Sequence, residues 1–209
     1  ALTWDDTRKI SSYITPNEQT ISGFAARVLA AAGGRERISL SRKIFQAMRL
    51  SDSLGTYGIA YVEDPESPFS RALGKTEIVD TGRFPRMTLY NRTGDCDDTT
   101  ALVGSLLESV GIRTAILTTP GHIFLAFDSG EPVENVQYLS NENLEVVSRG
   151  GRAWIPVETT ILSQGFMAAW ASASSLVRKH APAGSFEFIP LSEMRDAYPA
   201  LPLPPSSIT

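Results

Sequence analysis

The chain of 209 residues has one cysteine, Cys96, and only two histidines, His122 and His180. A single cysteine excludes an intrachain disulfide framework and any metal site with several thiolate ligands. No apolar run approaches the roughly 20 residues that span a bilayer, so no membrane-spanning helix is expected. The net charge is −4 and the basic residues are scattered. This charge pattern argues against nucleic acid and against an anionic membrane surface as partners.

The composition is that of a folded domain with a sizeable core. Hydrophobic residues make up 42% of the chain and charged residues 20%, which is too little charge for a disordered polyelectrolyte. We expect a single domain over residues 1–197 and a Pro-rich tail or linker over 198–209. The chain begins at Ala1 rather than Met, as a mature or trimmed form would.

The first ninety residues have a helical pattern followed by an irregular stretch. Thr15 as cap, Pro16 at the first helical position and Glu18 in the capping-box position predict a helix start. That helix should end at Gly33-Gly34, and a second should span residues 38–50. Residues 51–90 are expected to be irregular, with one short strand at 59–62.

The chain after Cys96 predicts one central helix that leads into an antiparallel sheet. An apolar stripe from Leu102 to Val110 indicates a helix that stops at Gly111. The expected strands are 114–119, 122–127, 143–149, 152–159 and 186–189, with a helix at 166–178. The hairpin signal Gly150-Gly151 joins two of these strands. The predicted class is α+β.

Cys96 is the candidate nucleophile because it stands at the expected first turn of the central helix. The unpaired amides and the dipole at a helix start favour an anion such as a thiolate. Gly94, two residues earlier, permits a close approach of the backbone to a ligand.

Three acids surround the cysteine, and more than one role is open to them. Asp95 is a natural N-cap and Asp98 lies three residues later, as in a capping box. The acids also suit loop amides, Arg92 or, less well, a hard cation such as calcium. Carboxylates beside a thiol raise its pKa, so a catalytic Cys96 needs a protonated histidine nearby.

His122 is the candidate partner, 26 residues after Cys96 at the start of an apolar strand. Glu158 is the candidate orienting acid, because it ends a strand that can lie beside that of His122. Asp128 is excluded, since six strand residues place it about 20 Å from His122. His180 follows two basic residues and is expected at a solvated helix end.

Together these segments resemble the transglutaminase-like branch of the papain-type cysteine enzymes. The resemblance covers residues 84–162 and rests on Arg92-x-Gly94-x-Cys96, Leu106-Leu107-x-x-x-Gly111-Ile112, Pro120-Gly121-His122 and Trp154-x-Pro156-Val157-Glu158-Thr159-Thr160. It implies a papain/transglutaminase-like core in which the nucleophile helix packs on an antiparallel sheet. It also implies Cys96 as nucleophile, His122 as base and acid, and Glu158 as third member, where the family has Asp. No cofactor or metal is implied.

The family includes protein crosslinkers, peptidases, other amidases and inactive members, so the fold does not fix the substrate. A peptide, a protein or a cell-envelope amide is the expected substrate, and the resemblance implies a periplasmic or otherwise exported protein, with a cytoplasmic location still open.

The leading hypothesis is acyl transfer from an amide through a thioester. The Cys96 amide would hold the oxyanion, with Tyr90 as a second donor and Asp95 and Arg92 as supporting residues. The alternative is an inactive module that binds peptide or envelope polymer. The oligomeric state is left open.

Overall fold

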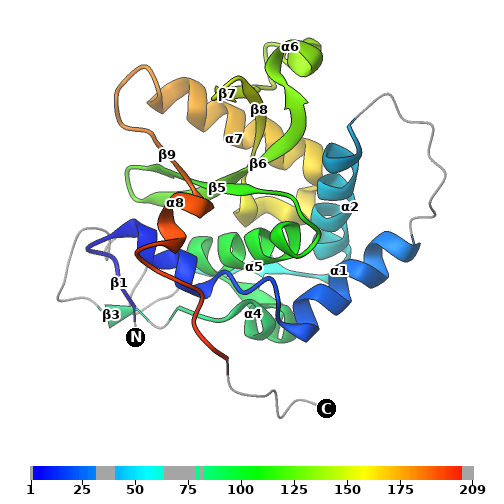
Figure 1. The fold of residues 1–209 in the computed structure, drawn as a ribbon, viewed down its shortest axis with the longest axis vertical. Coiled ribbons are helices and arrows are strands. Elements are labelled where there is room, and N and C mark those ends of the chain that lie inside the picture. The colour runs from blue at the N-terminus through cyan, green and yellow to red at the C-terminus, as the bar shows by residue number, and fades with distance from the viewer. Residues whose placement is uncertain (1, 32–40, 64–78, 81, 204–209) are drawn as a thin grey trace.

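The computed structural model describes residues 2–31, 41–63, 79–80 and 82–203 of the chain (Figure 1). The N-terminal part is helical, and a five-stranded antiparallel sheet in the order β7-β8-β6-β5-β9 follows it. The predicted α+β class is confirmed at this level. None of the described helices is long and apolar enough to cross a membrane.

The helices and short strands before the sheet are η1 (Thr7–Tyr13), α1 (Gln19–Ala31), α2 (Arg42–Tyr57), α4 (Pro85–Asn91), α5 (Cys96–Ser109), β1 (Leu2–Thr3), β2 (Ala60–Tyr61), β3 (Val79–Asp80) and β4 (Thr93–Gly94). The strands of the sheet are β5 (Thr114–Thr119), β6 (His122–Pro132), β7 (Val147–Arg149), β8 (Arg152–Val157) and β9 (Glu187–Pro190). The remaining helices are α6 (Val133–Val136), η2 (Gln137–Leu139), η3 (Thr159–Gln164), α7 (Phe166–His180) and α8 (Leu191–Arg195).

Helices cover the two faces of the sheet, α5 on one side and α7 on the other (Figure 1), and the central strands β5, β6 and β8 are largely buried. On β6 the residues alternate: Ile123, Leu125 and Phe127 join the core that contains α5. Phe124 and Ala126 join the second core, which is packed against α7. Because neighbouring strand residues point to opposite faces, a strand covered on both sides has the continuous apolar run seen after His122.

The prediction that residues 51–90 are irregular is wrong in two places. Helix α2 continues to Tyr57, and α4 begins at Pro85, a favoured first helical residue. The polar and Gly-containing end of α2 hid this continuation, because such residues favour a helix weakly. Gly55 is required there by packing, since a Cβ atom would lie 2.4 Å from the carbonyl oxygen of Leu162. The turn signals at residues 64–68 lie outside the described residues.

The other boundaries shift by a few residues. Helix α1 begins at Gln19 rather than after Thr15. Helix α2 begins at Arg42. The predicted end of the first helix at 33–34 and residues 38–40 of the second lie outside the described residues. The Gly150-Gly151 hairpin is confirmed, although β7 is shorter than predicted. In the predicted tail, the Leu201 N–H donates to the Ser12 carbonyl at 2.9 Å, so its described part contacts the N-terminal segment.

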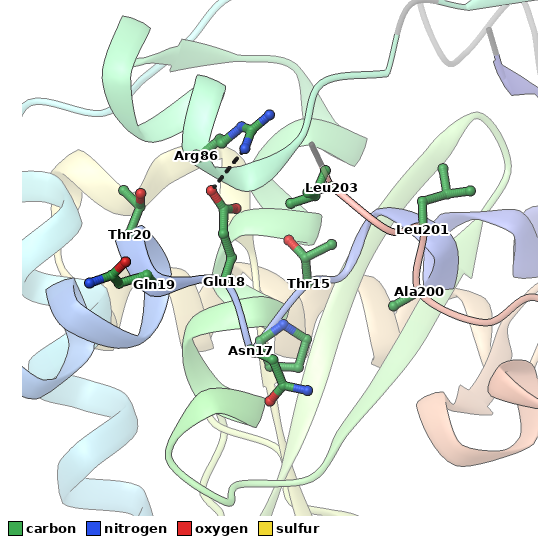
Figure 2. A pocket seen from close by; sticks show the side chains of 10 residues that line it. Thr15, Asn17, Glu18, Gln19, Thr20, Arg86, Ala200, Leu201 and Leu203 are labelled. Carbon is green, nitrogen blue, oxygen red and sulfur yellow. Dashed lines mark ion pairs between the residues drawn. The ribbon is translucent and has the colours of Figure 1, made fainter. Parts of the chain in front are cut away.

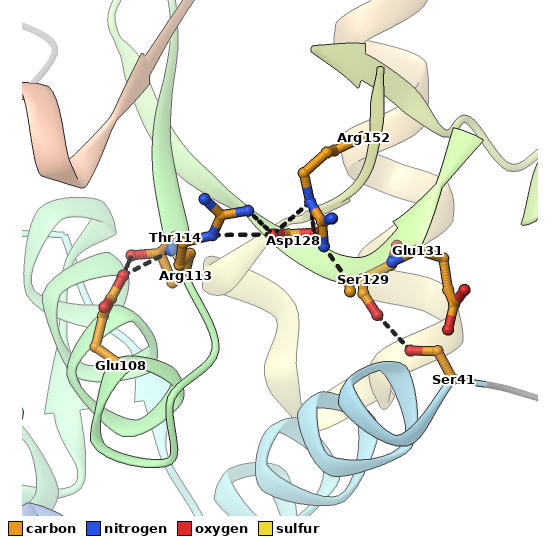
Figure 3. A network of polar contacts seen from close by, with 9 residues as sticks. Ser41, Glu108, Arg113, Thr114, Asp128, Ser129, Glu131 and Arg152 are labelled. Atoms are coloured by element: carbon orange, nitrogen blue, oxygen red, sulfur yellow. Dashed lines mark hydrogen bonds and ion pairs between the residues drawn. The ribbon is translucent and has the colours of Figure 1, made fainter. Parts of the chain in front are cut away.

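A buried carboxylate on β6 binds the arginine before β5 and the arginine that begins β8 (Figure 3). The Asp128 side chain is fully buried and accepts hydrogen bonds from Arg152 Nε and Arg113 Nε, each at 3.0 Å. Burial raises the pKa of Asp128, but bonds from Arg152, the Gly130 N–H and Arg113 hold it below its ordinary value. The two arginines precede β5 and begin β8, so this carboxylate fixes both neighbours of β6.

Asp128→Asn is expected to lower the free energy of unfolding by about 3 kcal/mol, because it removes the one anion between two guanidinium groups. Urea unfolding at neutral pH measures the change. Asp196→Asn at an exposed position is the matched control and should change little. Equal effects of the two substitutions would contradict the anchoring role of Asp128.

Candidate active site

Helix α5 begins at Cys96 because Asp95 caps it. The Asp95 carboxylate accepts a hydrogen bond from the Asp98 N–H at 3.3 Å, and its carbonyl accepts one from Thr99 Oγ1 at 2.7 Å. The short strand β4 before it pairs in parallel with β2, which fixes the entry of the chain into the helix. The cysteine therefore occupies the first helical position, as the sequence predicts.

The thiol of Cys96 is buried, with the residue 5% exposed. Burial raises the pKa of Cys96 well above its ordinary value, and the charges of Asp97 and Asp95 raise it further. The backbone N–H of Ile123 acts in the opposite direction. Ile123 follows His122 directly, so the sulfur lies against the start of β6.

His122 and Glu158 lie in contact. His122 Nε2 is 2.7 Å from Glu158 Oε2. The pairing of β6 with β8 sets Leu125 opposite Val157, so Glu158 is the diagonal neighbour of His122 on the same sheet face. Gly121, with φ +72°, makes the tight turn that places His122 at the strand start. This bond uses Nε2 and leaves the ring's Nδ1 for another partner.

The Glu158 carboxylate is held from both sides. Its Oε1 accepts from the Thr160 N–H at 3.0 Å and from Thr160 Oγ1 at 2.7 Å, so it also caps η3. Glu158 is 3% exposed. Burial raises the pKa of Glu158, but the bonds from His122 and Thr160 more than offset this, and the pKa lies below its ordinary value. The carboxylate is thus ionised at neutral pH and fixed beside the imidazole.

A cluster of buried threonines connects the three elements of the site. Thr159 Oγ1 lies 2.9 Å from Thr100 Oγ1 and 3.2 Å from Thr99 Oγ1. Thr100 Oγ1 in turn donates to the carbonyl of Ile123 at 3.5 Å. These contacts join the first turns of α5 to η3, next to Glu158, and to β6, next to His122. Sequence reasoning missed this cluster because threonines in a helix give no spacing signal.

Asp98 does not complete a capping box. Its carboxylate accepts from the backbone N–H of Arg83 at 2.7 Å and lies 3.8 Å from Arg83 Nη1. Gly94 is needed for the same packing, because a Cβ there would lie 2.7 Å from the Asp98 Cβ. The close approach at Gly94 is therefore to Asp98 and not to a ligand.

The three acids are also close enough to share a cation. One oxygen from each of Asp95, Asp97 and Asp98 lies within 4.8 Å of the others, and all three residues are buried. Calcium takes six to eight oxygen ligands. The trio supplies three of them, and two of its members already accept hydrogen bonds from Asp98 N–H and Arg83 N–H.

The predicted supporting residues Tyr90 and Arg92 point elsewhere. Tyr90 is 65% exposed on α4, and the Arg92 guanidinium lies 4.5 Å from the centre of the Tyr57 ring. Tyr61, on β2, lies nearer to the start of α5 and is 43% exposed. Burial raises the pKa of Tyr61 to about 12, and the negative charge of Cys96 contributes in the same direction. Its register partner is Gly94, two residues before the cysteine.

The remaining candidates lie away from this cluster. Asp128, excluded on the sequence, occupies the arginine network described above. His180 ends α7, where its Nδ1 lies 2.9 Å from Ser185 Oγ.

Comparison of the chain with models of known protein families, with curated proteins and with solved structures finds no match. Cys96, His122 and Glu158 are therefore the residues from which a function can be inferred.

Glu158→Gln is expected to lower the free energy of unfolding at neutral pH by about 2 kcal/mol, because a charged, buried hydrogen-bond acceptor is lost. The folded-state pKa of Glu158 lies below its unfolded value, so its stabilisation is complete above about pH 4.3 and is lost as the pH falls through the folded value. The difference between wild type and variant should thus shrink on acidification.

Thermal unfolding between neutral and acidic pH measures this difference. Glu193→Gln, at an exposed position on α8, is the control and should keep a melting temperature close to that of the wild type. A Glu158→Gln effect that stays constant as the pH falls would contradict the ionised, hydrogen-bonded carboxylate.

Proposed function

We propose that the protein catalyses cysteine-dependent acyl transfer on an amide, as transglutaminase-like enzymes of the papain type do. Two contacts carry this proposal. His122 Nε2 lies 2.7 Å from Glu158 Oε2 at the start of β6. The next residue of β6, Ile123, interacts through its backbone with the Cys96 thiol. A nucleophile, a base and an acid that orients the base are the components that this chemistry needs.

In the proposed reaction the thiol is protonated at rest, in keeping with the raised pKa of Cys96. His122 accepts the thiol proton as the sulfur attacks the amide carbonyl carbon. The tetrahedral intermediate collapses, the C–N bond breaks, and His122 returns the proton to the departing amine. A thioester remains on Cys96.

The thioester is resolved by a second nucleophile. With water, the oxygen attacks the thioester carbon while His122 removes a proton; the C–S bond then breaks, and His122 returns the proton to the sulfur, which releases a carboxylic acid and the thiol. With an amine, the same steps give a new amide. Glu158 stays ionised throughout, orients the imidazole and stabilises its protonated form.

The proposed oxyanion donors are the backbone N–H of Cys96 and the Tyr61 hydroxyl. The first amides of a helix have no partner within the helix, so the Cys96 N–H is suited to a developing negative charge. Tyr61 replaces Tyr90 in this role because its strand β2 pairs with β4 directly before Cys96, and Tyr61 is 43% exposed, against 65% for Tyr90.

The proposed substrate is an amide of a peptide, a protein or a cell-envelope polymer, and the proposed location is the periplasm or another exported compartment. Both follow from the resemblance of residues 84–162 to the family. The second candidate is a binding module with the same fold and an unreactive cysteine. The observation that favours it is the thiol, whose pKa is raised by burial and then by its acidic neighbours Asp97 and Asp95.

Acylation by p-nitrophenyl acetate tests the enzyme proposal without knowledge of the natural substrate. The wild type should release p-nitrophenol in a burst of about one equivalent and carry an acetyl group on Cys96, as seen by mass spectrometry. His122→Ala should slow this step by about 100-fold, because it removes the general base.

The matched control is His180→Ala, which alters the only other histidine and should acylate like the wild type. Cys96→Ser should lose the burst. Equal acylation of Cys96 in His122→Ala and in the wild type, or no acylation of Cys96 in either, would favour the binding module.

A further inference from the structure

Three arginines form a cluster near the hairpin that joins β7 to β8. Arg149 ends β7 and lies directly opposite Arg152, which begins β8. Arg113 directly precedes β5. In Figure 3 the guanidinium groups of Arg113 and Arg152 approach the Asp128 carboxylate from two sides. Six strand residues, or about 20 Å, separate Asp128 from His122, so this arginine cluster lies apart from the candidate active site.

The arginine cluster lies against two aromatic rings. Arg152 and Trp154 are two residues apart on β8, so their side chains share one face of the sheet with Arg149, the partner of Arg152. The Arg113 Cζ atom lies 6.0 Å from the centre of the Trp154 ring, and the Arg149 Cζ atom lies 5.7 Å from that of Phe188. The two rings meet edge to face, with their centres 5.2 Å apart. Two of the guanidinium groups thus lie over one pair of contacting rings.

The arginine cluster has more positive charge than its surroundings compensate. Within the part of the chain that the structure describes, Asp128 pairs with both Arg113 and Arg152, and no acid forms an ion pair with Arg149. Like charges directly opposite each other on neighbouring strands destabilise a sheet, and Arg149 and Arg152 are such a pair. In a chain of net charge −4, this local excess of positive charge indicates an anionic partner.

The arginine cluster keeps hydrogen-bond donors that a partner can reach. Arg113 and Arg152 each donate to Asp128 through Nε and Nη2, so the Nη1 groups remain for another acceptor. The side chains of Arg113 and Arg152 are 59% and 36% exposed, and Arg149 is exposed as well. The Asp128 side chain is fully buried. The accessible surface therefore presents the guanidinium groups and not the acid.

We propose that the arginine cluster binds an acidic segment of a protein, with carboxylates at alternate positions. Alternate side chains of an extended chain lie on one side, about 6.6 Å apart, which suits arginines on adjacent strands with Cβ atoms about 5 Å apart. The guanidinium fork matches a carboxylate, as the contacts of Asp128 show. Arginine and aromatic residues are enriched at protein–protein interfaces, which favours a protein over a phosphate polymer. This surface goes beyond the proposed acyl-transfer function.

Fluorescence anisotropy of a labelled peptide, Glu-Ser-Glu-Ser-Glu blocked at both ends, tests the proposal with the full chain. Saturable binding is expected, at least about tenfold tighter than that of Gln-Ser-Gln-Ser-Gln, which has no carboxylates. The affinity should fall as the NaCl concentration rises from about 50 to about 200 mM, because salt screens exposed charges. Arg149→Glu should weaken binding at least about tenfold, because an attractive contact becomes a repulsive one.

Arg27→Glu makes the same change of charge at an exposed position on α1 and is the matched control, which should bind like the wild type. The melting temperature separates binding from a structural role. Arg149→Glu removes the repulsion between Arg149 and Arg152, so without peptide it should melt no lower than the wild type.

The proposal is overturned if the acidic peptide shows no saturable binding, if Arg27→Glu weakens binding as much as Arg149→Glu does, or if Arg149→Glu melts at a lower temperature than the wild type. Linear polyphosphate is the competing ligand. If polyphosphate binds in a manner that Arg149→Glu abolishes while the acidic peptide does not bind, the cluster recognises a phosphate polymer and the proposal is overturned as well.

Discussion

The candidate active site depends on the buried Glu158 carboxylate. One oxygen contacts the His122 ring, and the other accepts two bonds from Thr160, so a single side chain connects β6, the end of β8 and η3. The threonine cluster around Thr159 extends this connection to the first turns of α5, where Cys96 lies. A buried acceptor with all its partners in place restricts the geometry strongly, because each lost bond leaves a costly unsatisfied group. The imidazole is therefore held at one position relative to the helix start.

The thiol stands in an environment with opposing effects. The helix start and the Ile123 N–H favour a thiolate, whereas burial and the charges of Asp97 and Asp95 disfavour it, and the net effect raises the pKa. A base that acts during attack is compatible with this balance, since a stable thiolate is then unnecessary. Asp95 and Asp98 have structural roles. Asp95 caps α5, and the Asp98 carboxylate accepts a hydrogen bond from the backbone N–H of Arg83.

The parts of the fold that sequence could predict are those with a strong period or a turn signal. Helix α5, strands β5 and β6 and the Gly150-Gly151 hairpin follow from such patterns, and so does the nearness of Glu158 to His122. Helix α4, the end of α2 and the roles of Arg83 and Tyr61 depend on tertiary contacts between distant segments. The spacing of Thr15 and Glu18 predicted a helix cap, but α1 begins at Gln19, and the Glu18 carboxylate lies 3.5 Å from Arg86 Nη1 instead (Figure 2). Local propensity does not contain that information.

The pH dependence of iodoacetamide labelling tests the central claim most directly, because Cys96 is the only cysteine and every alkylated thiol reports on it. If His122 takes the thiol proton as the sulfur attacks, labelling of Cys96 should occur at neutral pH although the pKa of Cys96 is raised. It should fall by at least about tenfold in His122→Ala, in proportion to the loss of a general base. Labelling that rises only at alkaline pH, at equal rates in the wild type and in His122→Ala, would contradict the account.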